Sequence, residues 1–238
     1  MGILIPDSAL QYVILQRTDH LCPGHGRLVR RLVQLTPFYK SAVEAEAHRH
    51  GQQIKQRFSD EMTGEYESIR RWLPPRVSTI LDIGCGIGGI DVLLFRHYER
   101  DAKLEFYELD KSTVDDHIHY GFHGQASFYN SLEATAQTLA DNGIERQHVH
   151  LLEATGDCRI DLPGRVDLVI SLLSWGFHYP VRTYLQRVYE LMRVGGRLIL
   201  DVRRHTDGLQ ALVQRFGSVR VIGQDRKRSR VVVDRESA

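Results

Sequence analysis

The sequence predicts an α/β protein with a doubly wound, mainly parallel sheet and a helical segment in front of it. Short apolar runs alternate with helical patterns after Pro75, four glycines gather at the first strand-to-helix turn, and the apolar spacing before Pro74 is helical. The chain has 238 residues, of which 42% are hydrophobic and 26% charged, as in an ordinary globular protein. We therefore expect residues 1–75 to form a helical N-terminal cap and residues 76–238 to form an α/β domain.

The cap is expected to consist of helices. Three leucines spaced three or four residues apart share one helix face: Leu28, Leu32 and Leu35. Thr36-Pro37 has the residue types of an N-cap followed by proline at the first helical position. This pair predicts one long helix over residues 38–58. The helical pattern restarts at Ser59-Asp60 and ends at the two prolines.

The rest of the chain is expected to alternate between strands and helices. The predicted strands are residues 79–83, 104–109, 149–152, 166–171, 197–202, 219–222 and 231–233. The predicted helices are residues 90–98, 132–140, 184–192 and 208–216, with Gly195-Gly196 as a turn and Asp207 as an N-cap. The last two strands are joined only by a short charged turn, so they must be antiparallel.

The stretch LDIGCGIGGIDVLL, residues 81–94, carries the clearest ligand signal. Its four glycines allow a tight turn and a close approach of the backbone to a ligand. In a parallel sheet, ligands bind at the carboxyl ends of the strands, where this turn is expected. Two patterns fit. Gly84, Gly86 and Gly89 satisfy the dinucleotide fingerprint G-x-G-x-x-G, with Asp110 placed 21 residues later, whereas D-x-G-x-G-x-G begins at Asp82.

The second pattern resembles the class I S-adenosylmethionine-dependent methyltransferases, over roughly residues 75–235. VDLVIS, the segment YLQRVYELMRVGGRLILDV and the terminal hairpin are similar to that family as well. The resemblance implies a Rossmann-like seven-stranded sheet with an antiparallel last strand, an S-adenosyl-L-methionine cofactor and methyltransferase activity. It is favoured over a NAD-dependent oxidoreductase because an anionic Asp82 would repel a pyrophosphate.

The family pattern also implies roles for individual residues. The acidic residue at the end of the first strand helps to hold the methionine end of the cofactor, and an acidic residue ending the second strand accepts hydrogen bonds from the ribose. Asp110 takes the ribose role, with Glu108 as the alternative, and Asp157, with Glu153 as the alternative, contacts the adenine. The cofactor-binding set is Asp82, Gly84, Cys85, Gly86, Gly88, Glu108, Asp110, Asp157 and Ser171.

Aromatic residues and a histidine gather in SLLSWGFHYP, residues 171–180, after the fourth predicted strand. Methyl transfer needs an aligned acceptor, and a hydroxyl acceptor needs a base for its proton. Histidine titrates near neutral pH, so His178 is the expected general base. Trp175, Tyr179 and, from the cap, Tyr66 are expected to bind the substrate. The alternative for each of these residues is ordinary packing or structural hydrogen bonding.

We predict no metal site. Family members that hold a divalent cation have acidic ligands at the end of the fourth strand, where this chain has Ser171-Leu172-Leu173. A second group of potential ligands matches no zinc signature: Asp115, Asp116, His117, His119 and His123.

The expected function is methylation of a small molecule, at an oxygen of a sugar or natural product, because SLLSWGFHYPVRTYL resembles proteins similar to sugar O-methyltransferases. The alternatives are N-methylation of a small molecule, the oxidoreductase, and a catalytically silent cofactor-binding partner subunit. A net charge of +1 and the absence of the N/D-P-P-Y/F tetrapeptide argue against a nucleic-acid partner.

The expected location is cytoplasmic. No apolar run approaches the roughly 18 residues that span a bilayer, so we expect no membrane partner. The first residues, MGILIPDSALQYVIL, lack a basic region and a cleavage site. The three cysteines are scattered and odd in number, as in a reducing compartment. Homodimers are common in the family, so the resemblance implies one.

Overall fold

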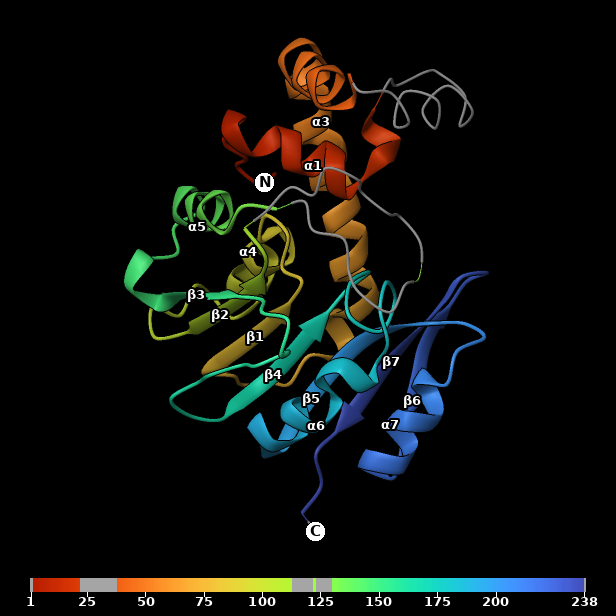
Figure 1. Cartoon of the computed structure of the whole chain (residues 1–238). Coiled ribbons are helices and arrows are strands. Elements are labelled where there is room, and N and C mark those ends of the chain that lie inside the picture. Colours follow the sequence, from red (N-terminus) through yellow and green to blue (C-terminus); the bar gives the residue numbers. More distant parts are fainter. Residues whose placement is uncertain (1, 22–37, 113–121, 123–129, 238) are drawn as a thin grey trace.

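The protein is built on a seven-stranded mixed sheet (Figure 1). The computed structural model describes residues 2–21, 38–112, 122 and 130–237. The strands are β1 (Thr79–Ile83), β2 (Glu105–Asp110), β3 (Val149–Glu153), β4 (Val166–Ser171), β5 (Met192–Arg203), β6 (Arg220–Gln224) and β7 (Arg228–Asp234). Their order is β3-β2-β1-β4-β5-β7-β6, and β7 runs antiparallel to both of its neighbours. The doubly wound sheet with its antiparallel last strand is therefore confirmed.

Helices cover both faces of this sheet. The α-helices are α1 (Leu10–Gln16), α3 (Tyr39–Ile69), α4 (Gly89–His97), α5 (Leu132–Asp141), α6 (Arg182–Leu191) and α7 (Gly208–Phe216). Successive strand residues point to opposite faces, so Ile80 joins the apolar core beneath α1, α3, α4 and α5, whereas Leu81 joins the core beneath α6 and α7. Among the described residues, none of the helices combines the length and apolarity needed to cross a bilayer.

The cap shares a core with the α/β domain. Val13 and Ile14 of α1 and Phe58 of α3 are buried in the same cluster as Ile80 and Phe106 of the sheet. Figure 1 shows α1 and the adjoining part of α3 lying over α4 and α5. The cap is therefore packed onto the domain beside the glycine turn.

The long cap helix differs from the prediction in where it is interrupted. It runs without a break through Ser59-Asp60, where the sequence pattern predicted a restart, and its backbone is non-helical at His50 instead. Ser59 faces the interior, where its hydroxyl accepts a hydrogen bond from the Ile3 amide at 3.0 Å. Ser59, a residue type that often begins a helix, thus lies in the middle of α3 and makes a tertiary contact there. The predicted cap features at Leu28, Leu32, Leu35 and Thr36-Pro37, and the acidic and histidine group at 115–123, lie outside the described residues.

Two predicted boundaries of the α/β domain also differ. Gly195-Gly196 lies within β5 rather than in a turn, because the register of β4 with β5 jumps between Val166 and Leu168 and leaves a bulge. Asp207 precedes α7 as predicted, yet its side chain does not cap the helix. It pairs instead with Arg182 at 2.8 Å.

A buried ion-pair network joins the cap to the sheet. Asp201 of β5 is fully buried and accepts hydrogen bonds from Arg228 and Arg230 of β7, each at 2.7 Å. The same two arginines reach Glu65 of α3, at 3.4 and 2.6 Å. The network therefore ties the cap helix to β5 and β7.

Replacing Asp201 by asparagine is expected to lower the free energy of unfolding by about 3 kcal/mol or more, because Arg230 stays buried without its main partner. Asp207→Asn is the matched control, since it breaks an exposed pair with Arg182 that is worth less than about 1 kcal/mol. Urea denaturation measures both. Equal losses in the two variants would contradict the role given to Asp201.

Candidate active site

A cavity of about 790 Å³ opens at the carboxyl ends of β1, β2 and β4. This volume is within the usual range for small-molecule and cofactor sites. Its walls come from the glycine turn, the ends of β2 and β3, the β4–α6 loop (residues 172–181), the cap, and the β6–β7 hairpin. The strand order reverses between β1 and β4, so the cavity lies at the switch point where open parallel sheets bind ligands.

The glycine turn forms one wall because both its conformation and its surroundings require glycine. Gly84 and Gly86 have φ values of +77° and +56°, and both line the cavity. A Cβ added at Gly84 would lie 1.8 Å from the Ser174 hydroxyl oxygen, and one at Gly89 would lie 2.7 Å from the Phe58 ring. The turn is therefore pressed between the β4–α6 loop and the cap. Gly88 does not line the cavity; it faces α5 instead.

Asp110 is held rigidly beside this turn. One carboxylate oxygen accepts hydrogen bonds from the Gly86 amide at 2.9 Å and from the Asn130 side chain at 3.0 Å, and the other accepts from the Lys111 amide at 2.8 Å. Burial raises the pKa of Asp110 to about 6. Asn130 was not predicted. Its amide also donates to the Gly86 carbonyl at 2.7 Å, and its only sequence signal is its place just before α5.

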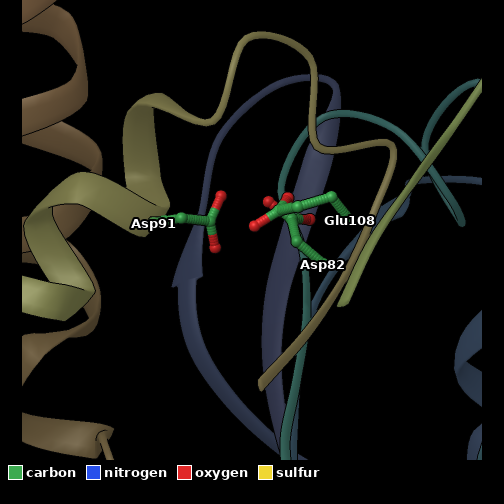
Figure 2. A group of neighbouring side chains, drawn as sticks. All are labelled: Asp82, Asp91 and Glu108. Carbon is green, nitrogen blue, oxygen red and sulfur yellow. The ribbon is translucent and has the colours of Figure 1, made fainter. Parts of the chain in front are cut away.

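The other acidic residues of the predicted set divide between the cavity and the interior. Asp82 lines the cavity, although its side chain is almost fully buried. Glu108, the alternative ribose residue, lies off the cavity and faces Asp82 and Asp91 beneath α4 (Figure 2). Burial raises the pKa of Asp82 and Glu108 well above the ordinary values, and that of Asp91 to about 7. Of the two candidates on β2, only Asp110 reaches the cavity.

The predicted adenine contacts do not reach the cavity through their own side chains. Asp157 is exposed and accepts a hydrogen bond from Thr155 at 2.5 Å, and Glu153 accepts one from the Ser112 amide at 2.9 Å. Neither residue lines the cavity, whereas Thr155 and Cys158 do. The segment after β3 is thus in the expected place, although different residues of it face the cavity.

The β4–α6 loop brings His178 and Tyr179 to the cavity. The His178 amide donates to the Ser174 carbonyl at 2.8 Å, and its ring stands edge-on to Phe177 with centroids 5.0 Å apart. Burial raises the pKa of the Tyr179 phenol well above its ordinary value, so this hydroxyl stays protonated. Cys85 also lines the cavity, and burial keeps its thiol protonated as well.

Three predicted residues support the site without lining it. The Ser171 hydroxyl donates to the Ile83 carbonyl at 2.6 Å and accepts from the Trp175 amide at 3.0 Å, which joins the ends of β1 and β4. The Trp175 ring is fully buried and donates to the Val181 carbonyl at 2.9 Å. The Tyr66 hydroxyl lies 2.8 Å from a ring nitrogen of His97 on α4. The two aromatic side chains are therefore packed away from the cavity rather than facing it.

The resemblance implied a cap over the active site and a contact from Tyr66, but the sequence did not identify the residues that the cap and the hairpin contribute to the wall. Helical spacing identifies an apolar face but not which neighbour it meets, and no motif marks these positions. The residues are Gln16, Arg17, Phe58, Glu61, Met62, Asp225, Lys227 and Arg228. The cap residues among them lie against the glycine turn, where a Cβ at Gly86 would meet Gln16 and one at Gly89 would meet Phe58.

Several solved methyltransferase structures are similar to this architecture. An O-methyltransferase family protein from Burkholderia thailandensis aligns over 95% of this chain and 72% of its own, with a TM-score of 0.54 and 14% identity. The chain has the class I methyltransferase fold. The StiE O-MT structure (residues 961–1257) aligns over 91% of this chain and 84% of its own, with a TM-score of 0.52 and 12% identity.

An RNA-modifying enzyme has the class I methyltransferase fold as well. The T. thermophilus 16S rRNA N2 G1207 methyltransferase RsmC aligns over 74% of this chain, with a TM-score of 0.52 and 15% identity, and this chain spans 43% of that protein's length. No protein-family model matches the sequence, and no curated protein matches it either. At sequence identities of 12–15%, these similarities concern the fold alone.

Gly84→Ala is expected to destabilise the protein more than Gly143→Ala. Both glycines have positive φ, at +77° and +92°, but a Cβ at Gly84 would collide with Ser174 whereas one at Gly143 would meet nothing within 4 Å. The backbone cost, about 1–2 kcal/mol, is common to both, and crowding adds about 1–3 kcal/mol at Gly84. Urea denaturation measures the difference.

Adding Ser174→Gly to Gly84→Ala is expected to remove the extra loss, because it removes the colliding side chain. An unchanged loss in the double variant would show that crowding against the β4–α6 loop does not select glycine at this position.

Proposed function

We propose that this protein is an S-adenosyl-L-methionine-dependent methyltransferase. The observation that carries the proposal is the common wall that Asp82, the glycine turn and Asp110 form at the carboxyl ends of β1 and β2. The class I methyltransferase fold supports it. The oxidoreductase alternative gains no such support, since Asp82 at the expected pyrophosphate position would repel the phosphates whenever it is ionised.

The residues at this wall suit the parts of that cofactor. Asp110 presents an oriented carboxylate to the ribose hydroxyls, and Asp82 offers a carboxyl oxygen to the ammonium of the methionine end, whose positive charge favours the ionised form of that carboxyl group. Thr155 and Cys158 border the space for the adenine. A Cβ at Gly86 would lie 2.6 Å from the Gln16 side chain, so no side chain fits at this position of the turn. Its backbone is therefore free to lie close to the cofactor. When bound, the cofactor supplies a methyl group on a positively charged sulfur.

The β4–α6 loop supplies the groups for an acceptor. We assign His178 as the base that receives the proton of an acceptor hydroxyl, because it is the histidine that lines the described cavity wall. The Tyr179 phenol stays protonated and therefore serves as a hydrogen-bond donor rather than a base. Phe58 and Met62 of α3 add apolar surface that excludes water from this space.

The acceptor we favour is a small molecule methylated at oxygen. The cap makes up residues 1–75 of 238, so an alignment over 95% of the chain includes most of the cap, and that neighbour is described as an O-methyltransferase family protein. The rRNA methyltransferase aligns over a smaller share, 74%. A cap that closes over the cavity suits a small acceptor, and the near-neutral net charge of +1 offers little attraction for RNA.

S-adenosylhomocysteine is expected to bind the purified protein with micromolar affinity in a calorimetric titration, whereas NADH does not bind. Asp110→Asn is expected to weaken this binding about tenfold or more, because a charged hydrogen-bond acceptor is lost. Asp157→Asn, at an exposed side chain outside the cavity, is the matched control and leaves affinity within about twofold. Binding of NADH alone would contradict the proposed cofactor.

His178→Ala is expected to lower kcat by about 10²–10⁴-fold with a hydroxyl acceptor and to leave S-adenosylhomocysteine affinity unchanged, because general-base assistance is lost. His48→Ala, at an exposed position of α3, controls for the loss of a histidine. Methyl transfer to a panel of sugars and phenols provides the assay. A catalytically silent cofactor-binding subunit would bind S-adenosylhomocysteine yet transfer no methyl group to any acceptor.

A further inference from the structure

Three buried carboxylates meet beneath the glycine turn, and the proposed cofactor site uses only one of them. Asp82, Asp91 and Glu108 are 3%, 0% and 0% exposed, and each offers an oxygen within 4.8 Å of the other two. Figure 2 shows the three side chains pointing toward one another from β1, α4 and β2. We refer to these residues as the carboxylate trio.

The fold itself brings the trio together. Asp82 pairs directly with Glu108 in the parallel ladder of β1 and β2, so both side chains project from the same face of the sheet. That face is covered by α4, which begins at Gly89 directly after the turn and carries Asp91 in its first turn. Positions on three successive elements, β1, α4 and β2, therefore converge on one point between the sheet and the helix.

The carboxylates of the trio lack the partners that buried charges require. Both oxygens of Asp91, both of Glu108 and one of Asp82 accept no hydrogen bond from a described N–H or hydroxyl group. The weakly donating Cys85 thiol lies near Glu108 but donates to the Gly86 carbonyl at 3.6 Å, and Asp82 can bond to Asp91 only if one of them carries a proton. None of the ion pairs among the described residues includes a member of the trio. Buried carboxylates are stable only when paired, protonated or bound to a cation.

We propose that the carboxylate trio binds a hard divalent metal ion, Ca²⁺ or Mg²⁺. An all-oxygen carboxylate set is the ligand type these ions prefer. Two oxygens bound to one Ca²⁺ at about 2.4 Å lie at most about 4.8 Å apart, and one oxygen from each member of the trio lies within that distance of the others. Two positive charges offset most of the three negative ones, whereas a single ammonium from a ligand in the cavity would offset one.

The ion has a route to this site and a structural effect there. Asp82 lines the cavity, so a cation that enters the cavity reaches the trio through this residue. Bound to all three carboxylates, it would connect the start of α4 to β1 and β2 directly below the glycine turn. This site differs from the prediction of no metal, which considered only the end of the fourth strand and the group at 115–123 and not the acids at 82, 91 and 108.

The test titrates the full chain, after treatment with a chelator, with CaCl2 and separately with MgCl2 at pH 8. Calorimetry is expected to show one saturable site for at least one of these ions, and the melting temperature is expected to rise by several degrees on saturation. Glu108→Gln and Asp91→Asn, which keep the side-chain volume, are expected to weaken this binding at least tenfold. Asp141→Asn, at an exposed position of α5, is the control and retains it.

Two results would overturn the proposal. One is the absence of saturable binding of either ion at millimolar concentration; the other is binding that both Glu108→Gln and Asp91→Asn retain in full. A trio neutralised by protons alone gives the first result, together with a melting temperature that either variant raises at pH 8. Titration of the same samples with S-adenosylhomocysteine keeps the two proposals separate, since cofactor binding without metal binding would overturn only the metal site.

Discussion

The candidate site depends on the parallel register of β1 between β2 and β4. This register places Asp82 opposite Glu108 on one side and opposite Ile170 on the other, and it brings the strand ends to one edge. The turn that leaves β1 must then pass between the β4–α6 loop and the cap helix, where a Cβ at Gly84 would strike Ser174. Only glycine fits at position 84, and the turn that it allows forms one wall of the cavity.

A second constraint links the acceptor side of the cavity to the rest of the protein. Asp201 accepts a hydrogen bond from the Leu173 amide at 3.1 Å, in addition to those from its two arginines. Leu173 holds a positive φ of +58°, which is unfavourable for leucine and must be stabilised by its surroundings. Because Arg228 and Arg230 also bind Glu65, one buried network fixes the β4–α6 loop, the β6–β7 hairpin and the cap together. Movement of the cap would therefore affect the loop that carries His178.

The sequence was most informative where local chemistry determines local structure. The strand at 166–171 and the glycine turn were found from apolar runs and glycine spacing, because these features need no knowledge of distant neighbours, and the resemblance to the methyltransferases pointed to Asp110. Asn130 and the trio could not be found in this way, since each depends on segments that meet only in the folded chain. Trp175 and Tyr66 were expected at the acceptor because aromatic residues suit such a site, but the packing of the β4–α6 loop and of α3 against α4 turns them inward.

We expect S-adenosyl-L-methionine to bind against the wall formed by Asp82, the glycine turn and Asp110. A crystal structure of the full chain with S-adenosylhomocysteine would show this. We expect the ribose hydroxyls on Asp110, the homocysteine end near Asp82 and the sulfur facing the β4–α6 loop. A ligand bound outside the cavity, or with its ribose away from Asp110, would contradict it.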